Sequence, residues 1–175
     1  MKDNKMVKYP LILGLVALVS GLLLALVYNI TAPIIEDNTN KRENAAILEI
    51  FGEDAKIENI SESLNTDDND KGVNNAYIVK SNAKSYYVYK ISVKDGVGSD
   101  DSSAVVALED GKIYTLKFIT VGDDYAKTYD SKKYIDGIVS KDSLTNSDVV
   151  ADATYTGEYL IEAINAAIAH QGRVK

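Results

Sequence analysis

The sequence predicts an α+β protein, with one N-terminal transmembrane helix followed by an antiparallel sheet flanked by helices. Three observations predict this class. Residues 11–27 carry no charged side chain, residues 76–121 contain runs with the period-two alternation of strands, and residues 157–170 repeat apolar side chains at helical spacing. The chain has 175 residues, so about 140 remain after the anchor, the usual size of one domain.

The first predicted element is a membrane anchor. With its neighbours, the uncharged run 11–27 reaches about 20 residues, the span of a bilayer core. Tyr9 and Tyr28 lie at its two ends, where amphipathic aromatic rings prefer the membrane interface. Three lysines precede the run on a short tail. We therefore expect a single-pass protein of the cell membrane, with a cytoplasmic N-terminus and an extracytoplasmic C-terminal domain.

A cleaved signal peptide is the alternative interpretation of this run. The best small-residue cleavage site ends at Thr31-Ala32, and Pro33 would follow the cut, which disfavours cleavage. The apolar region would also be long for a signal peptide. These features favour retention of the anchor.

The predicted domain boundaries are 1–32 for the tail and anchor, 33–60 for a stalk helix and 61–175 for the extracytoplasmic domain. Pro33 is expected to break the anchor helix, because proline lacks the backbone N–H that a helix interior requires. A second helix is expected to follow and to end near Gly52. Its predicted apolar face comprises Ala45, Leu48 and Phe51.

The domain is predicted to begin with a polar surface loop over residues 61–75. Four strands are predicted next, at 76–81, 85–93, 104–109 and 112–121. Asp110-Gly111 joins the last two, and this dipeptide is a strong hairpin signal because both residues tolerate positive φ. Residues 134–139 predict a short helix or strand, and residues 157–170 an amphipathic helix.

Composition excludes several classes of function. The formal net charge of the chain is -7. Because the N-terminal tail is net positive, the net charge of the remaining residues is more negative than this, which disfavours binding to nucleic acid. The chain contains no cysteine, so disulfides, cysteine-ligated metals and thiol catalysis are excluded. His170 is the single histidine, and no nucleophile-elbow motif accompanies it. We interpret it as a surface residue.

The candidate chemistry lies in residues 148–156, which read DVVADATYT and precede the last predicted helix. The first N–H groups of a helix lack intrahelical acceptors and lie at the positive end of its dipole, which favours a phosphate there. The hydroxyl of Thr154 would lie beside such a group. The alternative is that Thr154 or Thr156 caps the helix and does nothing more.

The same segment resembles the flavin-attachment motif of membrane-anchored FMN-binding domains, Asp-x-x-Ser/Thr-Gly-Ala-Thr-x-Thr/Ser. The matching residues are Asp148, Ala153, Thr154 and Thr156. The order of parts is similar to the G subunit of the Rnf ferredoxin:NAD oxidoreductase complex and to the C subunit of the sodium-translocating NADH:quinone oxidoreductase. The segments that carry this likeness are Thr31-Ala32-Pro33, Gly96-Val97-Gly98 and Asp110-Gly111-Lys112-Ile113.

This resemblance implies an electron carrier and not a free-standing enzyme. It implies that a flavin transferase joins FMN to Thr154 through a phosphoester, and that Asp148 belongs to the sequence that the transferase recognises. Ala153 and Thr156 complete the motif. The implied partners are the other membrane subunits of an Rnf-type ion-translocating complex.

Two departures from the family pattern leave other functions open. Ala151-Asp152 replaces the family's Ser/Thr-Gly, and residues 119–125 replace its Glu-Thr-Pro-Gly-Leu-Gly stretch. The alternatives are a flavin-free structural or assembly subunit, and a standalone cell-surface redox or binding module with the same fold.

Overall fold

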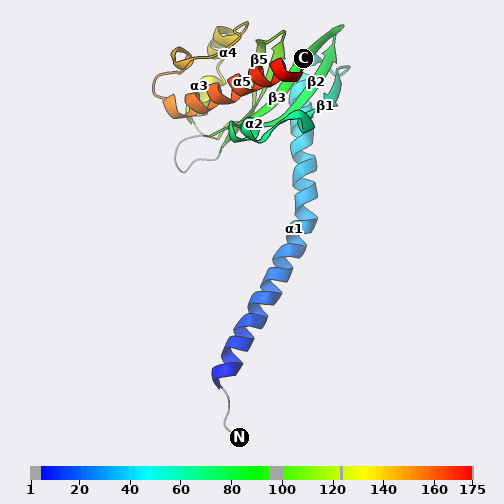
Figure 1. The fold of residues 1–175 in the computed structure, drawn as a ribbon, viewed down its shortest axis with the longest axis vertical. Coiled ribbons are helices and arrows are strands. Elements are labelled where there is room, and N and C mark those ends of the chain that lie inside the picture. The colour runs from blue at the N-terminus through cyan, green and yellow to red at the C-terminus, as the bar shows by residue number, and fades with distance from the viewer. Residues whose placement is uncertain (1–4, 95–100, 123, 175) are drawn as a thin grey trace. The chain divides into compact units, whose positions relative to one another are not determined.

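The computed structural model describes residues 5–94, 101–122 and 124–174, and it confirms the α+β class (Figure 1). The chain divides into two compact units, residues 1–41 and 42–175, which are described separately. The elements in chain order are α1 (Lys5–Phe51), β1 (Lys56–Asn59), the 3-10 turn η1 (Ser61–Ser63), α2 (Thr66–Asp70), β2 (Val73–Ser81), β3 (Lys84–Val93), β4 (Ser102–Glu109), β5 (Lys112–Thr120), α3 (Asp124–Tyr129), α4 (Lys132–Ile138), the 3-10 turn η2 (Asn146–Asp148) and α5 (Thr154–Val174).

The first unit consists of the greater part of α1. Among the described residues, α1 is the one helix long and apolar enough to cross a membrane, and its apolar stretch is not buried against the rest of the chain. The predicted break at Pro33 is wrong, because α1 continues through both Pro10 and Pro33. An interior proline costs a helix about 3 kcal/mol, but unpaired backbone groups in an apolar medium cost more, which favours a continuous helix.

The second unit is built on a five-stranded antiparallel sheet with the strand order β1-β2-β3-β4-β5. The four predicted strands are confirmed, and the edge strand β1 is an addition to them. The predicted hairpin is also confirmed, since Asp110 and Gly111 adopt φ of 52° and 81° between β4 and β5. Side chains of β3 alternate as predicted, with Tyr89 on one face and Val88 on the other.

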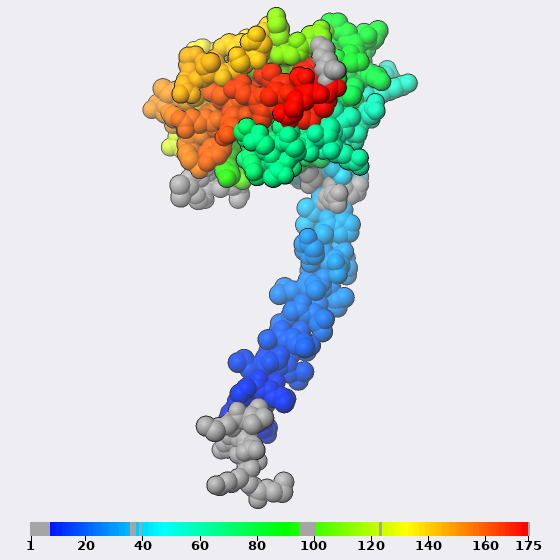
Figure 2. Space-filling model, viewed as in Figure 1, coloured from blue at the N-terminus to red at the C-terminus, as the bar shows by residue number. Residues whose placement is uncertain are grey.

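The larger core lies between one face of the sheet and α5, which crosses the strands in Figure 1. Leu160, Ile164 and Ala167 of α5 are fully buried in this core. The predicted amphipathic helix is therefore confirmed, and α5 extends beyond the predicted range at both ends. Its outer side lies along the face of the domain that Figure 2 shows in orange and red.

The last turns of α1, from residue 42, cover the opposite face of the sheet and close the smaller core. Ala46 and Ile47 are buried there and Phe51 packs against this core, whereas Ala45 is exposed. The predicted face of Ala45, Leu48 and Phe51, with Ile47 beside it, is therefore rotated from the observed one. The reason is Glu43, which is 1% exposed and faces the sheet as well. Its carboxylate accepts from the Tyr77 hydroxyl at 2.7 Å and from the Lys90 ammonium at 2.5 Å. An apolar-periodicity argument cannot anticipate a buried, paired carboxylate.

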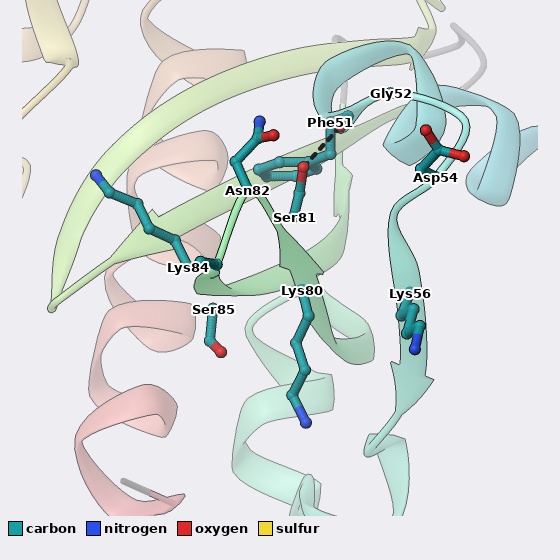
Figure 3. Close-up of a pocket in the computed structure, with 10 residues that line it drawn as sticks. Phe51, Gly52, Asp54, Lys56, Lys80, Ser81, Asn82, Lys84 and Ser85 are labelled. Carbon is teal, nitrogen blue, oxygen red and sulfur yellow. Dashed lines mark hydrogen bonds between the residues drawn. The ribbon is translucent and has the colours of Figure 1, made fainter.

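The C-terminus of α1 is tied to the hairpin between β2 and β3 (Figure 3). The Ser81 hydroxyl donates to the Phe51 carbonyl at 2.8 Å, which satisfies one of the free carbonyls at the helix end. Gly52 follows with φ of 90°, so the predicted end of this helix is confirmed. Lys56 lies beside this junction on the edge strand β1, where lysine discourages pairing with other chains, and Lys80 is its register partner on β2.

Residues 61–75 are not the loop that their polarity predicts, because they form η1, α2 and the start of β2. A capping box builds α2: the Asn65 side chain accepts from the Asp68 N–H at 2.9 Å, and the Asp68 carboxylate accepts from the Asn65 N–H at 3.0 Å. The segment 134–139, predicted as helix or strand, lies largely in the helix α4. The predicted glycine-rich connection Gly96-Val97-Gly98 lies outside the described residues.

Candidate functional site

The candidate site is the turn formed by residues 148–153 together with the first turn of α5. The Gly157 N–H donates to the Ala153 carbonyl at 3.0 Å, the first helical hydrogen bond of α5. Ala153 thus occupies the capping position, and the alternative that Thr154 or Thr156 serves as the cap is wrong. Thr154 opens the helix with an exposed side chain, whereas Thr156 is buried. Of the two threonines, only Thr154 presents its side chain to a reagent in solution.

The hydroxyl of Tyr129, at the end of α3, holds this turn closed. It donates to the Ala153 carbonyl at 2.8 Å and accepts from the Val150 N–H at 3.1 Å. Tyr129 is fully buried, and burial raises the pKa of its hydroxyl, so it remains a donor at neutral pH. One phenol therefore joins both sides of the turn from the inside.

Gly157 makes room for this phenol. A Cβ atom at position 157 would lie 2.0 Å from the Tyr129 hydroxyl oxygen and 2.8 Å from its ring carbon Cζ. Sequence reasoning missed both Tyr129 and Gly157. One signal was available for the second: glycine in a helix costs about 1 kcal/mol relative to alanine, so its presence in the first turn of an amphipathic helix indicates a close approach.

Asp148 fixes the other side of the turn and is only partly accessible. Its carboxylate accepts from the Thr145 N–H at 2.9 Å, in the capping box of η2, and forms an ion pair with Lys141. Partial burial acts to raise the pKa of Asp148, but the Lys141 ammonium and the Thr145 N–H outweigh it and lower that pKa. In the folded chain Asp148 is a charged residue that shapes the turn.

Asp152 occupies the position of the family's glycine and adopts the glycine-like conformation. Its φ is 71°, in the left-handed region that aspartate and asparagine tolerate better than other non-glycine residues. Glycine would adopt the same φ without strain. Asp152 adds a carboxylate two residues before Thr154, and Ala151 lacks the hydroxyl of the Ser/Thr in the resembled motif.

Aromatic side chains surround the first turn of α5. Tyr155 is 47% exposed and packs edge-on against Tyr159, with ring centroids 5.0 Å apart. On the other side of the turn, residues of α4 and of 147–150 line a hollow of about 380 Å³. Tyr134 lies there, and its buried hydroxyl has no hydrogen-bond partner among the described residues.

His170 lies far along α5 from this turn, and the expectation of a surface histidine is wrong because it is fully buried. Its ring joins the Ser63 hydroxyl at 3.1 Å and the Tyr89 hydroxyl at 3.0 Å. Ser63 gives its own hydrogen to the Ile60 carbonyl, so the histidine must donate to Ser63 and accept from Tyr89. A ring used in this way cannot activate Ser63 as a nucleophile. The histidine is a structural residue.

The geometry fits the attachment of a phosphorylated cofactor at Thr154. Thr154 is an exposed residue at the positive end of a 21-residue helix, next to a turn that Tyr129 and Asp148 hold in shape. The turn carries two carboxylates that disfavour an anion: Asp152, and Asp148, whose charge Lys141 offsets.

Comparisons with known proteins address the N-terminal part of the chain. No curated protein and no solved structure matches the chain. A family model described as the RnfG N-terminal region matches residues 1–50. That segment comprises α1 almost to its end at Phe51, including the apolar span. The chain is thus similar, over its N-terminal region, to RnfG.

Proposed function

We propose that this protein is a membrane-anchored electron-carrier subunit of an Rnf-type ion-translocating oxidoreductase complex, with FMN linked covalently to Thr154. The observation that carries the proposal is the exposed residue Thr154, which follows a fixed turn and opens α5. The match of residues 1–50 to the RnfG N-terminal region supports it independently, because the two features lie at opposite ends of the chain.

The attachment chemistry follows from the hydroxyl group. Thr154 Oγ1 would form a bond to the phosphorus of a flavin nucleotide and lose its proton to a base of a flavin transferase. FMN alone lacks a good leaving group, so the donor must carry a phosphoanhydride, as a flavin dinucleotide does. The anhydride bond to the nucleoside monophosphate breaks, and the product is a threonyl phosphoester. Bound FMN supplies transfer of one or two electrons, and the chain holds and orients it.

Within this proposal α1 anchors the domain on the outer side of the membrane. The lysines that precede the apolar span favour a cytoplasmic N-terminus. Outside the cell a dissociable FMN would be lost by dilution, so a covalent bond to Thr154 keeps the redox group with its membrane partners. Those partners are the other membrane subunits of the complex.

The test is the intact mass of the denatured full-length protein after coexpression with a flavin transferase. We expect one FMN increment for the wild type and for Thr154→Ser, and none for Thr154→Val, which keeps the shape but lacks the hydroxyl. Thr66→Val is the matched control, because Thr66 is likewise an exposed threonine that opens a helix, α2. Its increment should be unchanged. A wild-type mass without FMN, from cells in which the transferase modifies a known substrate, would refute the proposal.

The second candidate is a structural or assembly subunit of the same complex that carries no flavin. Asp152 favours it, because its carboxylate stands where the family has glycine, close to the proposed phosphate. Copurification of the other subunits with an unmodified chain would support this role and exclude the electron carrier.

A further inference from the structure

Two tyrosines on the first turns of α5 form an exposed aromatic surface beside Thr154. Tyr155 and Tyr159 are one helical turn apart, and their rings meet at an interplanar angle of 64°. Despite this contact Tyr155 remains 47% exposed. A ring of that size exposed to water at a functional turn is a candidate contact for a ligand.

A cation completes this surface. The Lys94 ammonium lies 5.5 Å from the centroid of the Tyr159 ring, in the range of a cation–π contact. Lys94 directly follows β3, so the surface combines a strand end with the start of α5. The Lys94 ammonium and the Asp101 carboxylate both act on Tyr155, and Lys94 is the one of the two that attracts a negatively charged aromatic ligand.

We propose that Tyr155, Tyr159 and Lys94 form a stacking platform for the isoalloxazine ring of the FMN carried by Thr154; this inference rests on the function proposed above. Isoalloxazine is planar and electron-poor, and the phenol of tyrosine is electron-rich, so the two stack well. Thr154 and Tyr155 are consecutive, and a ribityl phosphate chain is longer than the pitch of one helical turn, about 5.4 Å. The ring can therefore fold back onto Tyr155 while the phosphate stays at the helix start. Lys94 offsets the charge of the phosphodiester.

The alternative is that the two tyrosines stabilise only their own helix, as an i,i+4 aromatic pair does without any ligand. The two roles predict different fluorescence from the flavin. A phenol in contact with a photoexcited flavin donates an electron and then recovers it, which quenches the emission without net reaction. A phenol that is merely nearby in the helix has no such effect.

The experiment measures flavin fluorescence lifetime on the full-length, flavin-modified protein in detergent, together with its intact mass. We expect short lifetimes in the wild type, and about a fivefold smaller quenched fraction in Tyr155→Leu, from the strength of aromatic stacking. Tyr155→Trp should restore quenching, since indole is also an electron-rich ring. Tyr114→Leu is the control, because Tyr114 is 40% exposed on β5 and belongs to a separate aromatic cluster with Phe51 and Tyr86.

Each outcome is decisive for one of the two proposals. A full FMN increment in both proteins with equal lifetimes in wild type and Tyr155→Leu overturns the platform and leaves the attachment to Thr154 intact. A wild-type mass without FMN overturns the attachment, and the platform with it. Equal melting temperatures of Tyr155→Leu and Tyr155→Trp would show that the lifetimes report contact and not unfolding.

Discussion

The two ends of α5 are built for different purposes. At its start, Thr154 and Tyr155 are exposed, and the preceding turn is held by a single buried phenol, that of Tyr129. At its far end, His170 is fully buried between two hydroxyls, and Arg173 reaches both oxygens of the Asp68 carboxylate, at 2.5 and 2.6 Å. One end exposes Thr154 and Tyr155 to solvent, and the other fastens the helix to η1, α2 and β3. The proposed site and the contacts that stabilise the helix are thus separated along α5.

Gly157→Ala should give the largest effect, because the new Cβ would lie 2.0 Å from the Tyr129 hydroxyl oxygen. We expect a loss of about 3 kcal/mol in the free energy of unfolding, as for other overpacked sites, measured by denaturant titration in detergent. Gly172→Ala, near the other end of α5, meets nothing within 4 Å and is the matched control. A comparable loss in both variants would contradict the tight contact.

His170→Leu should cost about 2 kcal/mol, because it leaves the fully buried hydroxyl of Tyr89 without its partner. The midpoint of thermal unfolding should fall, whereas the FMN increment at Thr154 should be unchanged. Adding Tyr89→Phe should recover part of the loss. If His170→Leu abolished the increment in a folded protein, the separation of the two ends would be wrong.

Tyr129→Phe should cost about 1.5 kcal/mol, because it removes two hydrogen bonds within the turn. Hydrogen exchange at the Val150 amide should accelerate, while exchange in the second half of α5 follows only the global stability. Tyr134→Phe is the control, since the Tyr134 hydroxyl has no partner among the described residues. It should leave stability within about 0.5 kcal/mol.

Asp68→Asn tests the C-terminal end of α5 through the pH dependence of the free energy of unfolding. Burial acts to raise the pKa of Asp68, but the Asn65 N–H and the Arg173 guanidinium outweigh it and lower that pKa below 3.8. A carboxylate with a lowered folded pKa stabilises the fold at higher pH and loses this contribution as pH falls through the folded pKa. The deficit of Asp68→Asn, about 1 kcal/mol at pH 7, should therefore shrink below pH 3.8. Asp67→Asn, which alters an exposed ion pair, should show almost no deficit at either pH.

Asp152→Gly should have the smallest effect and the opposite sign. Glycine adopts φ of 71° without strain, so we expect a gain of about 0.5 kcal/mol and a higher fraction of flavin-modified protein. Asp152→Asn removes only the charge. If Asn matched Gly in the modified fraction, charge and not backbone strain would limit the attachment.

Strands β2 to β5, the Asp110-Gly111 hairpin and the last helix could be predicted from the sequence, because each has a strong local period or turn signal. β1 was missed because its four residues, KIEN, are too few and too polar to show alternation. The predicted buried face of α1 did not include Glu43, because the partner that allows its burial, Lys90, lies 47 residues away.

At the candidate site, the start of α5 was predicted close to its observed position, whereas the interactions that shape the turn were not. Thr154 belongs to a local motif, and the beginning of an amphipathic pattern locates it. Tyr129 lies 24 residues before Ala153, and no local pattern pairs them. The burial of His170 has the same cause, since its partner Ser63 is 107 residues away. Such contacts depend on the tertiary fold.

The buried position of the last turns of α1 determines which soluble fragment of this protein can be handled without detergent. A fragment that begins at residue 61 would lack Ala46 and Ile47 and would leave an apolar sheet face, including Val79 and Val88, open to water. It would also leave Lys90 without its ion-pair partner Glu43. Such a surface favours self-association. A fragment that begins at Arg42 keeps these turns of α1, and it is the shortest fragment suited to spectroscopy or crystallisation of the C-terminal unit.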